Sequence, residues 1–134
     1  MADINKVRTD PEKELKGIWT DFAEGIRLKI ARAGNSNYRK LLRELSEPHI
    51  KEIRGGTMDE ELNSTILKKV RAATILLDWK NIEENGEEVF YSKEKALEYF
   101  MDPSLRDFYL FVVIESENMD LFRKEVIGET IKNS

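Results

Sequence analysis

The sequence predicts an α+β fold in which an N-terminal β-hairpin and a second, short hairpin pack with about five α-helices. Three patterns support this prediction. Apolar and polar residues alternate on both sides of a glycine turn within residues 18–30, Asn85-Gly86 marks another tight turn, and helical spacing dominates the C-terminal half. We expect residues 1–16 to form a flexible or loosely docked arm and residues 17–134 a single α+β domain.

The first hairpin consists of two alternating segments, residues 18–22 and 26–30. Ala23-Glu24-Gly25 connects them and supplies a glycine that accepts a positive φ. Because every second side chain is apolar, we expect one face of this hairpin to be buried and the other to face solvent.

Two helices are expected between the hairpins. Asn35-Ser36-Asn37 offers capping side chains to the first, which carries the apolar stripe Tyr38, Leu41, Leu42 and Leu45 and ends near Pro48. Thr57 and Glu60 have the spacing of a capping box. The stripe that follows predicts a helix of about five turns reaching Leu77, with Trp79 after its end.

The C-terminal half begins with the Asn85-Gly86 hairpin and continues as helices. Ser92 is a candidate cap for a helix through Phe100. Asp102-Pro103 is typical of a helix start, and predicts a helix from Ser104 to about Glu117. A last helix is expected over residues 120–132.

Composition argues against catalysis and against bound cofactors. The 134 residues include no cysteine and one histidine, His49, so thiolate and multi-histidine sites are excluded. The glycines form no phosphate-binding motif, and the carboxylate clusters are typical of solvated surface. We therefore expect no enzyme activity, no metal and no cofactor. The sequence also has neither a membrane-spanning stretch nor a signal peptide pattern, so we expect a cytoplasmic protein without membrane partners.

The net charge of −4 is unevenly distributed, because residues 1–54 carry +3 and the remainder −7. Residues 25–43 hold a basic patch without acidic residues, made of Arg27, Lys29, Arg32, Arg39, Lys40 and Arg43. Such a patch, with Tyr38 as a stacking residue, would suit a nucleic-acid-binding regulator. The overall acidity opposes this interpretation, and alternating cations are also what the solvent face of a hairpin requires.

The helix predicted from Ser104 to Glu117 is apolar on two sides. Leu105, Phe108, Tyr109, Val112 and Val113 fall on one face, whereas Leu110, Phe111 and Ile114 point the other way among charged residues. Such a helix is either covered by its own domain or shared with a partner. Trp79, Leu110, Phe111 and Ile114 are the candidate partner-binding residues, although Trp79 also suits a core position.

The C-terminal part also carries a recognisable succession of short segments: Leu76-Leu77-Asp78-Trp79, Lys80-Asn81-Ile82, Asn85-Gly86-Glu87, Tyr91-Ser92, Ala96-Leu97, Asp102-Pro103-Ser104-Leu105-Arg106-Asp107-Phe108 and Phe122-Arg123-Lys124-Glu125. Over residues 60–134 this succession resembles the tail assembly chaperones of long-tailed bacteriophages and of prophages.

The resemblance implies a non-enzymatic role in tail morphogenesis. Such a chaperone binds the tape measure protein, helps to recruit tail tube subunits, works in the host cytoplasm and is absent from the mature virion. Self-association is compatible with this role. The alternatives are a nucleic-acid-binding regulator that uses residues 25–43, and a structural head–tail or tail completion protein.

Overall fold

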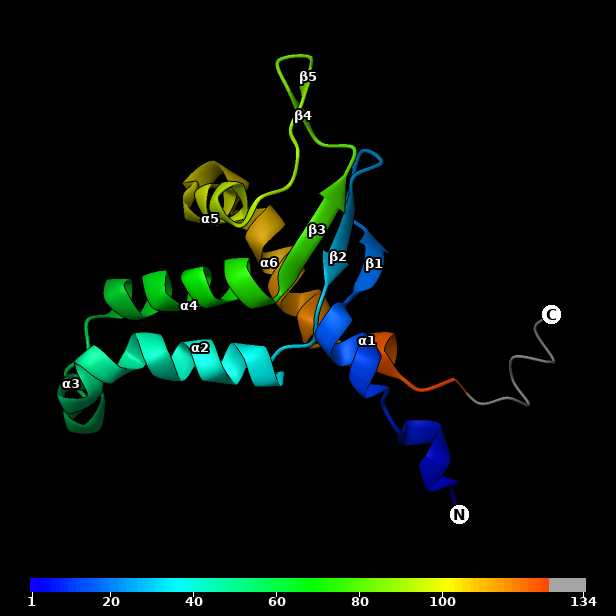
Figure 1. Ribbon diagram of the computed structural model, residues 1–134, viewed down its shortest axis with the longest axis horizontal. Helices are drawn as coiled ribbons and strands as arrows, with labels where there is room; N and C mark the ends of the chain where they lie inside the picture. The colour runs from blue at the N-terminus through cyan, green and yellow to red at the C-terminus, as the bar shows by residue number, and fades with distance from the viewer. Residues whose placement is uncertain (126–134) are drawn as a thin grey trace.

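The structure is a computed structural model that describes residues 1–125. The predicted α+β class is confirmed: a three-stranded antiparallel sheet and a two-stranded hairpin are combined with helices that make up most of the chain (Figure 1). The α-helices are α1 (Pro11–Lys16), α2 (Ser36–Ser46), α3 (Ile50–Gly55), α4 (Glu60–Thr74), α5 (Lys93–Met101) and α6 (Arg106–Ser116). Four 3₁₀ turns accompany them: η1 (Ile4–Val7), η2 (Glu47–His49), η3 (Pro103–Leu105) and η4 (Met119–Phe122).

The first predicted hairpin is confirmed. It forms β1 (Ile18–Asp21) and β2 (Arg27–Ile30), which pair with Thr20 opposite Leu28 and Asp21 opposite Arg27. The turn between the strands places Glu24 and Gly25 at positive φ, as a tight hairpin turn requires. Thr20, Leu28 and Ile30 are buried, whereas Asp21 is exposed. The sheet therefore has an inner face toward the core and an outer face that carries charged side chains.

The predicted five-turn helix is wrong at both ends. α4 begins after Asp59, and the Thr57 side chain does not cap it. The helix stops at Thr74, and Leu76–Lys80 forms β3, which pairs with β2. Pairing with β2 satisfies the backbone of a segment whose helical spacing looks acceptable in the sequence alone, so tertiary contacts override the local pattern. Strand order is β1-β2-β3.

The second predicted hairpin is also confirmed, as β4 (Glu83–Glu84) and β5 (Glu87–Glu88) joined by Asn85-Gly86, and it projects from the body (Figure 1). The expected caps of α2 and α5 are present, since Asn35 accepts from Tyr38 N–H and Ser92 accepts from Lys95 N–H.

The final predicted helix is replaced, in its described part, by the short turn η4, after which Arg123 is extended. The remaining residues of that prediction, 126–132, lie outside the described part of the chain.

Residues 1–16, expected as an arm, contain η1 and α1 and contact the C-terminal part of the chain. Asp10 N–H donates to the Phe122 carbonyl at 2.8 Å, and Thr9 forms a bridge with Arg123. Glu14 pairs with Arg32 at 3.1 Å, which ties α1 to the loop after β2.

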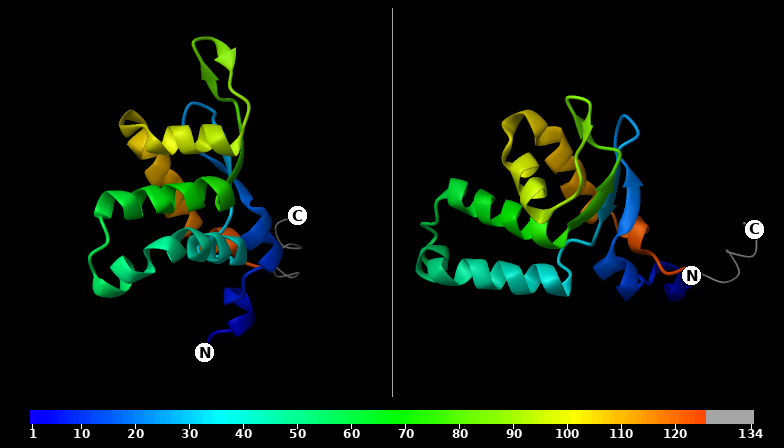
Figure 2. Two further views of the ribbon diagram at one scale, coloured as in Figure 1. Left: turned by 60° about the vertical axis from the view of Figure 1, so that its left-hand side comes forward. Right: turned by 45° about the horizontal axis from the view of Figure 1, so that its top comes forward.

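The helices lie on the inner side of the sheet in two sets. α2, α4 and α5 lie side by side, with α4 in the middle, and the α2–α3–α4 portion extends away from the sheet (Figures 1 and 2). α6 crosses behind the sheet and contacts α5 and β2. The main core lies where β2, β3, α4, α5 and α6 meet.

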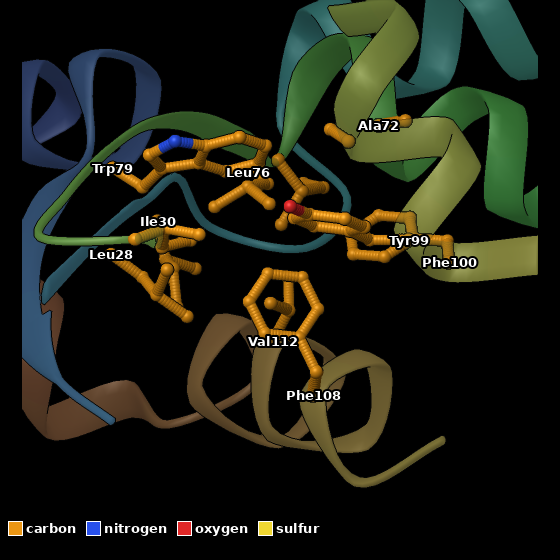
Figure 3. Packing of buried hydrophobic residues seen from close by; sticks show 12 residues of the cluster. Leu28, Ile30, Ala72, Leu76, Trp79, Tyr99, Phe100, Phe108 and Val112 are labelled. Atoms are coloured by element: carbon orange, nitrogen blue, oxygen red, sulfur yellow. The ribbon is translucent and has the colours of Figure 1, made fainter. Parts of the chain in front are cut away.

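Trp79 of β3 is part of that core and faces the helices that carry Tyr99 and Phe108 (Figure 3). Tyr99 of α5 stacks on it with 5.4 Å between ring centroids, and Phe108 of α6 and Tyr91 meet its edge. The indole Nε1–H donates to the Val89 carbonyl at 2.8 Å, so its polar atom is satisfied.

Replacing Trp79 with alanine is expected to lower the free energy of unfolding by about 3–5 kcal/mol, because the cavity would lie between three elements. Urea denaturation measures the change. Ile114→Ala, on an exposed position of α6, is the control and should change stability by less than about 0.5 kcal/mol. Similar losses in both variants would contradict the assignment of Trp79 as the core residue.

Candidate protein-binding surface

A well-capped turn fixes the position of α6. The Asp102 carboxylate accepts hydrogen bonds from the backbone N–H of Ser104 at 2.9 Å and from its hydroxyl at 2.7 Å. These bonds hold the pKa of Asp102 below its usual value. Pro103 follows the cap and starts η3, as the sequence indicates. The turn lets α6 leave α5 at a sharp corner.

α6 has the two-sided character that its sequence predicts. Phe108 and Val112 are buried against the sheet and α5, whereas Leu110 is 38% exposed and Ile114 is 63% exposed. Phe111 lies between these extremes: it is half-buried and its ring packs on Phe22 with centroids 5.0 Å apart. We call Leu110, Phe111 and Ile114 the α6 stripe. These three side chains lie within about 100° of one another around the helix, at 100° per residue.

An apolar hollow adjoins the start of α6. It has a volume of about 280 Å³ and lies between the end of β1, the loop after β3, the end of α5 and the beginning of α6. We call it the corner groove, and its apolar lining consists of Phe22, Ile26, Ile82, Tyr99, Leu105 and Phe108. Phe22 contacts Phe111 and also lines the groove, so it connects the α6 stripe with the corner groove.

The Tyr99 hydroxyl connects the groove to the second hairpin. It donates a hydrogen bond to the Glu84 carboxylate at 2.7 Å. Burial raises the pKa of Tyr99 well above its ordinary value, and the hydrogen bond to Glu84 adds to the effect. The hairpin is therefore fixed to α5 by a neutral phenol.

Among the four apolar candidates of the sequence, Trp79 must be reassigned. It is 5% exposed and lies in the core, because it faces inward from β3 onto Tyr99 and Phe108. Leu110, Phe111 and Ile114 share one face of α6, as expected. The groove residues Phe22, Ile26, Ile82 and Leu105 could not be recognised in the sequence, since three separate segments bring them together.

The basic patch does not form one surface. Arg27 pairs with Asp21 at 2.9 Å on the outer face of the sheet, where Lys29 lies opposite Asp78. Arg32 pairs with Glu14. The remaining cations of the patch, Arg39, Lys40 and Arg43, are exposed on α2, a separate element that extends away from the sheet (Figure 2). The basic residues are thus divided among the outer face of the sheet, the loop after β2 and α2, and three of them have an acidic neighbour.

The comparison with protein families gives one match. The family model of the YdaY prophage protein matches residues 33–133, which is more than half of the chain. This chain belongs to the YdaY prophage protein family. The matched range includes α6 and most of the corner groove, but it leaves out β1, β2 and the turn between them, which supplies Phe22 and Ile26. Neither a curated protein nor a solved structure matches the chain. Within residues 1–125, no helix of this YdaY family member is both long and apolar enough to span a bilayer.

Alkaline pH should destabilise the fold through its buried tyrosines. Burial, followed by the charges of Asp78 and Glu94, raises the pKa of Tyr91 from 10.0 to about 12, and the pKa of Tyr99 is raised as well. Because the folded state resists ionisation of these phenols, their stabilisation is complete below pH 10 and is lost as the pH rises above it. The melting temperature should therefore fall steeply as the pH is raised from 10.0 to about 12. The Tyr91→Phe/Tyr99→Phe variant should show a shallower fall, and an unchanged slope would contradict the interpretation.

Proposed function

We propose that this prophage protein is a tail assembly chaperone: a non-enzymatic factor that binds the tape measure protein and helps to recruit tail tube subunits. The prophage family and the resemblance over residues 60–134 support this proposal. The observation that carries it is the exposed α6 stripe, which continues into the corner groove through Phe22.

The physical argument concerns the cost of exposed apolar residues. Ile114 and Leu110 project into solvent from a helix whose other face is fully used in the core. A partner that covers them gains about 25 cal/mol for each Å² of apolar surface removed from water. Half-buried Phe111 gives this contact a rigid aromatic centre, as binding hot spots require. The many surface charges keep such a protein soluble while the apolar contact is open.

The moderate size of the surface fits temporary binding. Of the large apolar side chains in the α6 stripe and the corner groove, only Leu110 and Ile114 are exposed, so affinity comes from a small apolar contact that another protein can displace. A chaperone must release its client when tube subunits arrive. We therefore propose that the chain acts in the host cytoplasm and is absent from the finished particle.

The test is co-expression with the tape measure protein of the same prophage. The wild-type chain should increase the soluble fraction of that protein, and Leu110→Glu/Ile114→Glu should weaken binding about tenfold or more, since 1.4 kcal/mol corresponds to a factor of ten. Ile53→Glu is the matched control, because Ile53 is 41% exposed on α3, away from α6.

Two outcomes would contradict the proposal. One is a tape measure protein that stays insoluble while both chains are well expressed. The other is detection of this chain as a stoichiometric component of purified particles, which would favour a structural head–tail or tail completion protein instead.

A further inference from the structure

The charge around the corner groove gives information about the partner. Its lining includes three carboxylates besides the apolar floor, from Glu83, Glu84 and Asp107. A second hollow of about 630 Å³ adjoins it through the shared residues Ile26, Ile82 and Glu83, and adds Glu24 and Glu88. No lysine or arginine is among the described residues that line either hollow. The groove is thus apolar at its floor and negative at its rim.

The second hairpin concentrates this charge in an unfavourable arrangement. Its register places Glu83 opposite Glu88 and Glu84 opposite Glu87, so both cross-strand pairs consist of like charges. Like charges directly opposite each other destabilise a strand pair. Glu84 has Lys95 at 3.9 Å and the Tyr99 hydroxyl as neighbours, whereas no salt bridge of Glu83, Glu87 or Glu88 is found within residues 1–125.

A cationic partner would remove this repulsion. Lysine or arginine side chains at the rim would lie between carboxylates that now face one another, while an apolar side chain next to them would enter the floor formed by Phe22, Leu105 and Phe108. The corner groove alone, at about 280 Å³, has room for an apolar side chain, and the adjoining hollow of about 630 Å³ has room for the cations beside it.

Two other classes of ligand fit less well. Among residues 1–125, no group of three histidine, aspartate or glutamate side chains is placed to hold a metal ion. Nucleic acid phosphates would meet carboxylates of the same sign. A polypeptide segment satisfies both the rim and the floor.

We propose that the corner groove and the second hairpin (β4–β5, here called the glutamate hairpin) bind a segment of the client in which lysine or arginine residues flank apolar ones. This inference rests on the proposed function, since it specifies the chemistry of the segment that the client presents. The groove takes the apolar side chain, the hairpin takes the cations, and the α6 stripe extends the apolar contact.

The experiment uses two designed peptides with the full-length chain: an amphipathic helix of leucine and lysine, and the same peptide with glutamate in place of each lysine. Fluorescence polarisation measures their affinities at low and high salt. The leucine–lysine peptide should bind, and should lose about tenfold in affinity when the Debye length falls from about 30 Å at 0.01 M to about 8 Å at 0.15 M salt. The leucine–glutamate peptide should not bind.

Charge variants separate the groove from general electrostatic attraction. Glu83→Lys/Glu88→Lys should weaken binding of the leucine–lysine peptide at least tenfold. Glu44→Lys/Glu47→Lys, at exposed positions at the end of α2 and in η2, makes the same change in net charge and should leave the affinity within about twofold. Leu105→Ser, at the floor, should also weaken binding. Equal effects of the two double charge variants would overturn the proposal.

A single substitution serves as the control for correct folding. Glu88→Lys replaces one like-charge pair with an opposite pair, so the melting temperature should stay the same or rise while peptide affinity falls. Loss of affinity together with a lower melting temperature in all groove variants would overturn the inference.

These experiments distinguish failure of the inference about the groove from failure of the proposed chaperone function. If the groove variants keep full affinity for the peptide and still keep the tape measure protein soluble, the inference about the groove is wrong and the chaperone function stands. If the peptide binds as expected but the tape measure protein stays insoluble, the chaperone function is wrong.

Discussion

The packing of Trp79 is the contact on which the remaining architecture depends. Its indole lies between the sheet, which presents it from β3, and the two helices that supply Tyr99 and Phe108 (Figure 3). The same ring donates to the Val89 carbonyl and so fixes the chain that leaves the glutamate hairpin. Because one side chain joins these segments, the corner between α5 and α6 has a defined shape, and the groove beside it is a consequence of the core.

α6 fills the core with one face and leaves an apolar stripe on the other, where we propose that a partner binds. Phe108 and Val112 fill the core from one side, and this burial stabilises the helix without help from its opposite face. Leu110 and Ile114 are therefore free to remain in solvent. Phe111 lies at the boundary, held by Phe22, and links the stripe to the groove. The core thus holds the proposed binding surface in place, and such preorganisation would lower the entropic cost of association.

In the fold, four glutamates of the acidic half of the chain lie together beside an apolar hollow. The glutamates at positions 83, 84, 87 and 88 resemble ordinary surface charge in the sequence, but the register of the hairpin sets them against one another beside an apolar hollow. The cations in residues 25–43 show the reverse, because they are close together in the sequence but apart in the structure. They look like a patch in the sequence, yet the structure pairs Arg27 with Asp21 and Arg32 with Glu14, and it places Lys29 on β2 and the other three on α2.

Local patterns in the sequence determined much of this protein by themselves. Both hairpins were predicted from the alternation around Gly25 and from the Asn85-Gly86 turn. Most helices were predicted from the caps at Asn35, Ser92 and Asp102 and from the two-sided pattern of α6. Each of these signals acts over a few residues. Tertiary structure decided the rest. Leu76–Lys80 is a strand because β2 lies beside it, Trp79 is buried because α5 and α6 cover it, and the groove exists because segments distant in the sequence meet at one corner. Such contacts depend on partners that no local pattern specifies.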